Sequence, residues 1–385
     1  MKRMLLMVVL LIDIIFIVIL FLYFKLIYLY LYLFLNLLLV MFFTKKLLNI
    51  NIINLTKIVN LTKTYKIRKK ISKEEEYLKR IEIKTFDGSN GTTHPCIIKM
   101  DKLFNNYKYY LVHTPYNNYN IELENPSLCV SNDGINFIKP NRIIDPLLPI
   151  IKKDDIKLLK YYNDSFILFD NNELQIWYRY TEEDKSINPI KLKNQIYRIT
   201  TKDGINFTKP ELMIDNDGIW YLSPSIVRIK DLYYMYYFDK DLKMYCKTSK
   251  DLHQWNERVE IRINNFTGDF WHGEAKICQN KLYILFLSKD YNLYLCESNI
   301  CNPLEFNICN KLFLNYYDKC NIYGLAHPYK STFLIEDGLI ILYIPFVINR
   351  INYFKIKGIR SAKWTMTYTK LKIENFNKII KEDNK

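Results

Sequence analysis

The chain has 385 residues, of which 49% are hydrophobic and 15% aromatic, and its formal net charge is +15. This composition excludes an intrinsically disordered protein, because the apolar content is ample for a hydrophobic core. The length fits one large β domain or two ordinary domains.

The first feature along the chain is an almost wholly apolar segment from residue 4 to residue 43, interrupted by only three polar residues. A helix needs about 20 apolar residues to cross a bilayer, so this segment provides either two passes or one pass with an interfacial extension. A cleaved signal peptide has a much shorter apolar stretch and a small-residue cleavage site. We therefore predict a membrane anchor over residues 1–43, with the lipid bilayer as its partner through residues 4–43.

A basic segment follows the anchor. Residues 45–84 hold 12 Lys or Arg against 4 Asp or Glu, a charge of +8, and such a stretch beside a membrane attracts anionic lipid. We predict a juxtamembrane linker over residues 44–85 and a main domain over residues 86–385. Nucleic acid is not expected as a partner, because no recognition motif accompanies the charge. Under the positive-inside rule, two passes would keep both ends in the cytoplasm, whereas one pass would let the main domain lie outside; the side of the membrane stays open.

The eight cysteines include no Cys-x-x-Cys pair. A zinc site built on cysteines is therefore not expected, and the thiols are predicted to be buried in strands. We predict no metal site and no cofactor.

Two nearly identical decapeptides recur 70 positions apart: SNDGINFIKP at residues 131–140 and TKDGINFTKP at residues 201–210. Asp-Gly makes a tight turn, since glycine adopts positive φ without strain. TSKDLHQW at 248–255 repeats the layout without the glycine, and ESNICNPLEF at 297–306 is a looser copy. A turn that recurs in this way indicates a repeat architecture, with the aromatic residue after each turn packing between sheets.

Paired apolar segments with period-2 alternation precede these turns and a fifth pair follows them, as expected for β-hairpins. The starts of the pairs, at residues 94, 164, 223, 274 and 327, are separated by 70, 59, 51 and 53 residues. Units of this kind describe a five-bladed β-propeller, with a two-sheet sandwich as the alternative. The predicted fold class is all-β, a five-bladed β-propeller preceded by an N-terminal transmembrane anchor.

Propeller sites lie on the axis, where the innermost strands begin, so the residues at these starts are the candidates for chemistry. They are His94, Asp164, Ser223, Glu274 and His327. With these features the chain resembles the five-bladed propeller glycosidases, the clan that includes the arabinofuranosidase/xylosidase and invertase-type families. The resemblance rests on blade count, S-x-D-G-x-x-aromatic turns and carboxylates at strand starts. It implies a membrane-anchored glycoside hydrolase that acts on the glycosidic bonds of a glycan at its central funnel.

The resemblance also implies three carboxylates: a base or nucleophile on the first blade, an orienting aspartate on the second and a general-acid glutamate further on. HGEAKI makes Glu274 the acid, and YYNDSFILF makes Asp164 the orienting carboxylate. His94 stands where the family has aspartate and could accept the proton itself. Three acidic residues are alternative bases from neighbouring loops: Asp87, Asp101 and Glu124. The remaining alternative is that the base is absent and the funnel binds sugar without cleaving it.

Six residues are predicted to bind substrate: Arg179, Trp271, His272, His327, Ser223 and Glu124. Arg179 ends an inner hairpin, where it would clamp a substrate group or form a structural ion pair, and Trp271 with His272 would form a stacking platform. Two other functions stay open. One is a non-catalytic carbohydrate-binding or scaffold propeller. The other is a glycosidic-bond phosphorylase or transferase, with Arg179 and Lys276 as its phosphate pocket.

Overall fold

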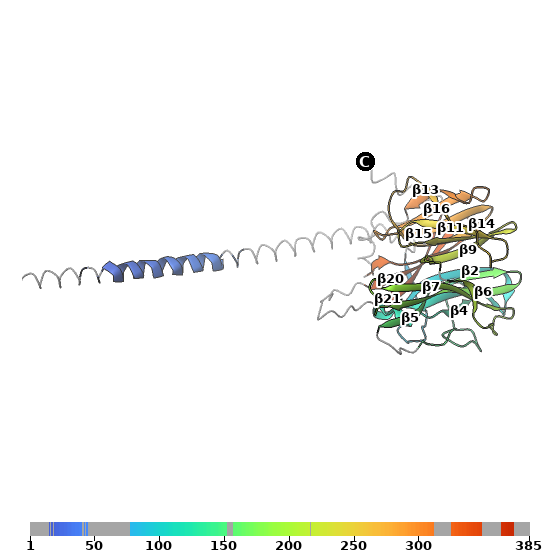
Figure 1. The fold of residues 1–385 in the computed structure, drawn as a ribbon, viewed down its shortest axis with the longest axis horizontal. Helices are drawn as coiled ribbons and strands as arrows, with labels where there is room; N and C mark the ends of the chain where they lie inside the picture. Colours follow the sequence, from blue (N-terminus) through green and yellow to red (C-terminus); the bar gives the residue numbers. More distant parts are fainter. Residues whose placement is uncertain are drawn as a thin grey trace, which may run out of the picture. The chain divides into compact units, whose positions relative to one another are not determined.

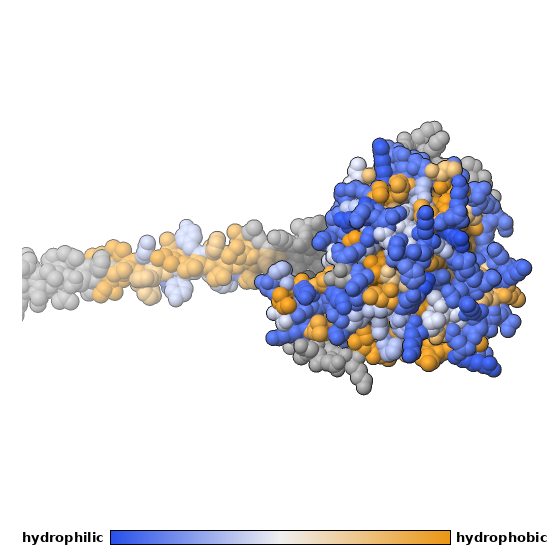
Figure 2. Space-filling model, turned by 45° about the vertical axis from the view of Figure 1, so that its right-hand side comes forward, coloured by the Kyte–Doolittle hydropathy of each residue, from blue (hydrophilic) through white to orange (hydrophobic). Residues whose placement is uncertain are grey.

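The computed structural model describes residues 15, 17, 19–40, 42, 44, 78–151, 157–215, 217–311, 325–348 and 363–372. The chain divides into two compact units, Met1–Glu75 and Glu76–Lys385. The first unit contains the helix Ile19–Val40, whose 22 residues are mostly apolar and are orange along most of their length in Figure 2. This helix is long and apolar enough to cross a membrane. Most of the remaining predicted anchor and most of the predicted linker lie outside the described residues.

The described part of the second unit is built from five sheets of mainly antiparallel strands (Figure 1). The first sheet contains β2 (Thr92–Phe104), β3 (Tyr107–Pro115) and β4 (Ser127–Ser131), with the short 3-10 helices η1 (Asn117–Tyr119) and η2 (Ile121–Leu123) between β3 and β4. The second contains β5 (Leu158–Asp170), β6 (Glu173–Asp184), β7 (Lys191–Thr201) and β8 (Glu211–Ile214). The third contains β9 (Leu222–Ile229), β10 (Leu232–Phe238), β11 (Met244–Ser249) and β12 (Val259–Glu260).

The last two sheets each include a strand from outside the regular hairpin order. The fourth contains β14 (Phe270–Cys278), β15 (Lys281–Ser288), β16 (Leu293–Asn299), β17 (Glu305–Lys311) and β13 (Arg262–Asn264), and β13 is parallel to β17. The fifth contains β18 (Leu325–Pro328), β19 (Thr332–Glu336), β20 (Leu339–Ile348), β21 (Trp364–Lys372) and β1 (Lys79–Ile81). Because β1 pairs with β21, this sheet joins the two ends of the unit, and strand pairing begins within the segment predicted as a linker.

The inner strands of the sheets follow one another in a ring. Strand β2 packs against β5, β5 against β9, β9 against β14, β14 against β19, and β19 against β2. The hydrophobic core is accordingly divided into clusters between successive sheets, which contain the buried side chains Trp177, Phe286, Phe346 and Tyr343. The all-β class predicted from the alternation is confirmed, and the inner strands bring residues that are far apart in sequence close together.

The repeated turns follow the third strand of each of the first three sheets. In the first, Asp133 accepts hydrogen bonds of 2.8 Å from the backbone N–H groups of Ile135 and Asn136, and Asp203 and Asp251 make the same pair of bonds in the next two sheets. The residue after each aspartate has a φ between +69° and +74°. The aromatic residues that follow pack into the clusters between sheets, as the repeat predicted: Phe137, Phe207 and Trp255.

Candidate active site

Three of the inner strands share a backbone kink, near the start of β2 and β9 and in the middle of β5. The φ angles of His94, Asp164 and Ser223 are +46°, +48° and +48°, and the strand register shifts beside each of them. A non-glycine residue in this conformation is strained by about 1–2 kcal/mol, and such strain concentrates at functional sites. The same kink in three sheets therefore marks one place in the molecule as the candidate site.

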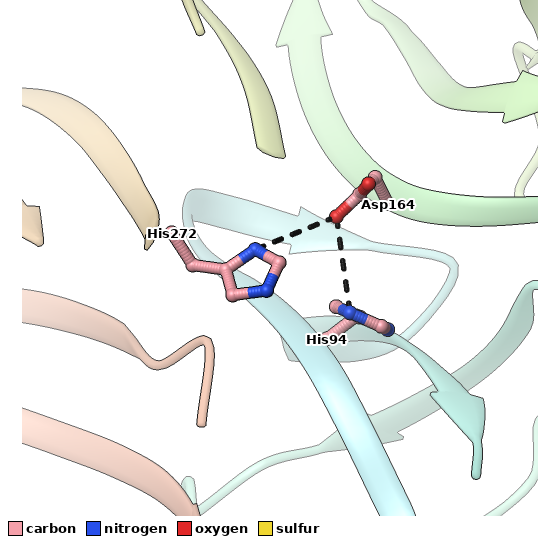
Figure 3. A group of neighbouring side chains, drawn as sticks. All are labelled: His94, Asp164 and His272. Carbon is pink, nitrogen blue, oxygen red and sulfur yellow. Dashed lines mark ion pairs between the residues drawn. The ribbon is translucent and has the colours of Figure 1, made fainter. Parts of the chain in front are cut away.

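The kinked residues meet His272 of β14 in a buried polar group that we call the axial cluster: His94, Asp164, Ser223 and His272. Asp164 Oδ1 lies 3.8 Å from His94 Nε2 and 3.9 Å from His272 Nδ1 (Figure 3). Ser223 Oγ lies 2.7 Å from His272 Nδ1 and 3.4 Å from Asp164 Oδ1. All four side chains are at most 3% exposed, so their protonation states are set by one another and by the protein around them.

Arg179 of β6 holds the aspartate of the axial cluster. Its Nη2 atom donates a 2.8 Å hydrogen bond to Asp164 Oδ2, while Nε donates to Asn163 Oδ1 at 2.8 Å and Nη1 to the carbonyl oxygen of Trp220 at 2.9 Å. The structural ion pair, one of the two roles considered for Arg179, is therefore present. A guanidinium held at three points keeps Asp164 in one orientation.

Burial and neighbouring charge separate the protonation states within the cluster. Burial lowers the pKa of His94 to about 4 and holds the pKa of His272 well below its usual value, although the charge of Asp164 acts in the opposite direction. Burial alone would raise the pKa of Asp164, but Arg179 and the two histidines outweigh this and the pKa lies below its usual value. At neutral pH the axial cluster thus contains an ionised carboxylate beside two neutral imidazoles.

Glu124 reaches the axial cluster from the loop that follows η2. Its side chain is buried, and Oε2 lies 3.6 Å from His94 Nδ1. Burial, reinforced by the charge of Asp164, raises the pKa of Glu124 well above its usual value, so Glu124 is protonated where Asp164 is ionised. Of the three alternative bases, Asp87 hydrogen-bonds to Thr85 and Ser89 in a turn and Asp101 lines a cavity at the far ends of the inner strands. Glu124 is the one beside His94.

Glu274 lies on the same strand as His272 but two residues further from the strand start. Its Oε1 atom accepts a 2.7 Å hydrogen bond from the Cys96 thiol and lies 3.3 Å from Lys276 Nζ. These residues and Asp101 line a cavity of about 1110 Å³ at the far ends of the inner strands, which we call the distal cavity. The side chains of residues 272, 274 and 276 lie on one face of β14, each further from the axial cluster than the one before. His272 is therefore the residue that meets Asp164. The predicted role of Glu274 as the acid stays a prediction.

Trp271 and His327 lie outside the axial cluster, and Trp271 contacts it through His272. Lys289 Nζ lies 3.1 Å from the centroid of the Trp271 ring, whose edge meets His272. The half-buried His327 ring lies 4.3 Å from the ring of Tyr291, centroid to centroid, and its Nδ1 atom lies 3.1 Å from the carbonyl oxygen of Pro328. Substrate binding by either residue also stays a prediction.

Sequence reasoning missed two residues of the fifth sheet that lie at the cluster. The Tyr329 ring lies 5.0 Å from the His94 ring and 4.7 Å from the His272 ring, between centroids. Lys330 is 1% exposed and donates a 3.2 Å hydrogen bond to the carbonyl oxygen of Ser165. Both residues follow His327 in the sequence HPYKS, and only the histidine of this stretch was predicted to lie at the site. Because β18 ends at residue 328 and β19 begins at residue 332, the interruption places Tyr329 and Lys330, and not the histidine, beside the cluster.

The axial cluster is a donor set that suits a divalent metal ion. One ligand atom each from His94, Asp164 and His272 lie within 4.8 Å of one another, and neutral imidazole with carboxylate binds zinc and similar ions. His94 Nδ1 lies 3.0 Å from Thr114 Oγ1, an outer contact of the kind that orients a metal-binding imidazole. His272 Nε2 has no hydrogen-bond partner within the described part of the chain. Spacings of 70 and 108 residues between these ligands explain why no local motif indicated them.

Comparison with curated proteins gives a short match. No protein-family model matches the chain. A stretch of 58 residues, 15% of this chain, is 36% identical to an "A type blood N-acetyl-alpha-D-galactosamine deacetylase" from Flavonifractor plautii. The match spans only 7% of that protein's length.

Comparison with solved structures covers most of the chain. The structure is similar to that of an N-acetylgalactosamine deacetylase from F. plautii in complex with blood group B trisaccharide, with a TM-score of 0.63, 13% identity, and coverage of 78% of this chain and 97% of that one. The fold is that of the propeller glycosidases. A Bombyx mori GH32 beta-fructofuranosidase matches with a TM-score of 0.51 at 15% identity, over 78% of this chain and 63% of that one. A GH43 beta-xylosidase/alpha-arabinofuranosidase from a compost microbial metagenome matches with a TM-score of 0.50 at 12% identity, over 77% and 94%. The resemblance seen in the sequence is thus confirmed at the level of fold.

Proposed function

We propose that the protein is a glycan-acting hydrolase in which the five sheets are the blades of a propeller and the axial cluster removes an acyl group from an amino sugar. The fold shared with the F. plautii deacetylase supports this proposal. The observation that carries it is the balance of charge at the axial cluster.

The cluster is surrounded by more positive than negative charge. The pKa of Asp164 is displaced towards its ionised form, and the pKa values of Glu124 and both histidines are displaced towards their neutral forms. The Arg179 guanidinium and Lys330 ammonium act on all of these groups. Amide hydrolysis develops negative charge on the carbonyl oxygen, which nearby positive groups stabilise. Glycosidic cleavage develops positive charge on the sugar ring, which the same groups would destabilise. The cluster is therefore better suited to removing an acyl group than to cleaving a glycosidic bond.

Each residue of the site then has a distinct role. His94, Asp164 and His272 would hold a divalent metal ion, which when bound would polarise the acyl carbonyl and a water molecule. Glu124, buried beside His94, would give its proton to the departing amine and would regain a proton from the carboxylic acid that the reaction forms. Arg179 fixes the orientation of Asp164, and Ser223 fixes that of His272 through their 2.7 Å contact.

Glycosidic-bond hydrolysis is the second candidate, and one observation favours it. Glu124 and Asp164 are carboxyl groups whose pKa values are displaced in opposite directions, and glycosidases use such a protonated and ionised pair. The phosphorylase alternative has less support: Arg179 is bound at the axial cluster, whereas Lys276 lines the distal cavity. We also propose that the helix Ile19–Val40 anchors the protein to a membrane, on the basis of its length and hydropathy.

Measuring acetate and sugar release separately tests this assignment. The full chain, purified in detergent, is incubated with glycans that end in N-acetylgalactosamine. Acetate release should stop with chelator, return with Zn²⁺ or Mn²⁺, and fall at least about a hundredfold in Asp164→Asn. The matched control Asp203→Asn, in an exposed turn, should behave as the wild type. Release of sugar without acetate would assign the glycosidase instead, dependence of turnover on phosphate the phosphorylase, and binding without turnover a carbohydrate-binding propeller.

A further inference from the structure

The distal cavity is a second candidate binding site, separate from the axial cluster. It has a volume of about 1110 Å³ and is lined by the far ends of β2, β5, β9, β14 and β19. That volume is slightly above the range of about 300–1,000 Å³ typical of ligand pockets, so a ligand of ordinary size fits. We propose that the distal cavity binds an uncharged sugar, with Glu274 accepting a hydrogen bond from one of its hydroxyl groups. This inference does not depend on the deacylation proposed for the axial cluster.

Glu274 supplies the unsatisfied polar atom at the floor of the cavity. Glu274 is 3% exposed, and its Oε1 atom accepts a hydrogen bond from the Cys96 thiol and forms an ion pair with Lys276. The Oε2 atom has no hydrogen-bond partner within the described part of the chain. A buried carboxylate oxygen without a donor is unfavourable, so a ligand that donates a hydrogen bond there gains more than it would from solvent.

Lys276 is the reason why we expect an uncharged ligand to donate the hydrogen bond to Glu274. Its Nζ atom donates to the carbonyl oxygens of Ile97 at 2.5 Å and Phe333 at 2.6 Å, and Thr332 Oγ1 lies 3.2 Å away. Three partners account for the three protons of the ammonium, so it has none left for a ligand. It does compensate the charge of Glu274, and a cationic ligand would therefore gain little. The floor offers a hydrogen-bond acceptor whose charge is already matched.

The walls of the distal cavity also favour a neutral, partly apolar molecule. Five basic and five acidic side chains line it, in a chain whose net charge is +15. Four of these side chains form two ion pairs: Lys99 with Glu336 at 2.8 Å and Arg228 with Asp170 at 3.1 Å. Between them lie apolar surfaces that include Phe166. Sugars combine apolar ring faces with hydroxyl edges, which matches a lining of balanced polar groups and aromatic side chains.

The test compares matched neutral and charged sugars on one preparation. The full chain carrying His272→Ala, which disables the axial cluster, is held in a detergent without a sugar headgroup. Its affinity for lactose, glucose, glucuronate and glucosamine is measured by isothermal titration calorimetry, and glucose is the neutral sugar that matches the two charged ones in size. Lactose and glucose should bind, and each charged sugar should bind at least tenfold more weakly than glucose. Adding Glu274→Gln should weaken lactose binding at least tenfold, because the amide replaces an ionised acceptor.

A second substitution keeps the proposal testable if the Glu274 variant fails to fold. Ile98 is half-buried and lines the cavity, so Ile98→Trp should fill the space and abolish lactose binding without lowering the melting temperature. No lactose binding in the His272→Ala background, tighter binding of a charged sugar, or binding unchanged by both further substitutions would each overturn the proposal. Acetate release by the wild type, measured separately, reports on the axial cluster alone.

Discussion

Three buried histidines should make the fold sensitive to mild acid. His94, His113 and His272 are at most 3% exposed, and burial lowers the pKa of His94 and of His113 to about 4 and that of His272 well below its usual value. In an unfolded chain the histidine pKa is about 6.5. Because the folded pKa values are the lower ones, these groups contribute stability above pH 6.5, and that stability is lost as the pH falls from 6.5 towards 4.

The size of the effect follows from the two pKa values. A histidine with a pKa of about 4 in the folded state and about 6.5 in the unfolded state costs about 1.8 kcal/mol of stability when the pH is lowered from 7 to 5. His94 and His113 together remove about 4 kcal/mol over that interval, and His272 contributes in the same direction. Whole domains are stable by only about 5–15 kcal/mol. We therefore expect the protein to approach unfolding near pH 5.

Urea unfolding at pH 7, 6 and 5 measures this directly. The full chain is kept in detergent with chelator present, so that metal binding does not contribute, and unfolding is followed by tryptophan fluorescence. His113 is on β3 and outside the axial cluster, which makes His113→Asn the matched variant. Its loss of stability between pH 7 and pH 5 should be smaller than that of the wild type by about 1.8 kcal/mol, whatever its stability at pH 7. A free energy of unfolding that is constant between pH 7 and pH 5, or the same loss in both proteins, would refute the reasoning.

Three further predictions concern packing, the site and the anchor. Gly273→Ala should destabilise the protein by about 1–3 kcal/mol, because a Cβ atom there would lie 2.8 Å from the β15 backbone and 2.8 Å from a phenylalanine ring. Gly218→Asn is the control, since a Cβ atom at residue 218 meets open space. Equal melting temperatures of the two variants would contradict this prediction. Asp164→Asn should lower stability by about 3 kcal/mol as well as abolish turnover, since it leaves Arg179 buried without its counter-charge, and an unchanged urea midpoint would contradict this. Deleting residues 1–43 should release the protein from the membrane pellet into the supernatant, and a truncated protein that still sediments would contradict the anchor.

The parts of the fold that were predictable from the sequence are those with local causes. The Asp-Gly turns were visible because the aspartate side chain binds backbone N–H groups two and three residues ahead, and the strands were visible because alternation is a property of neighbours. Strand β1 was missed for the opposite reason. It has three residues, and Lys79 pairs with Tyr368, a partner that nothing in its surroundings indicates.

The candidate site was predictable to the extent that hairpin starts could be placed from the sequence. His94, Asp164 and Ser223 were identified in this way and the structure brings them together, although Asp164 lies in the middle of β5 and not at its start. The site residue on β14 was harder to predict, because His272 and Glu274 lie on the same face of this strand. Which of the two reaches the axial cluster depends on how far β14 extends into the ring of inner strands. The position of a strand in the ring depends on how whole sheets pack. The alternation of apolar and polar residues along the strand carries no information about that position.

The arrangement of β14 also changes how a substitution at Glu274 should be interpreted. This strand supplies His272 to the axial cluster and, through Glu274 and Lys276, makes contacts with β2 and the fifth sheet near the distal cavity. Loss of turnover in Glu274→Gln would therefore not identify an acid, because the same change loosens the strand that positions His272. Lys276→Met separates the two explanations. If Glu274 acts through the position of the strand, Lys276→Met should lower turnover to a similar degree; if Glu274 transfers a proton, turnover in Lys276→Met should persist and only its pH profile should shift.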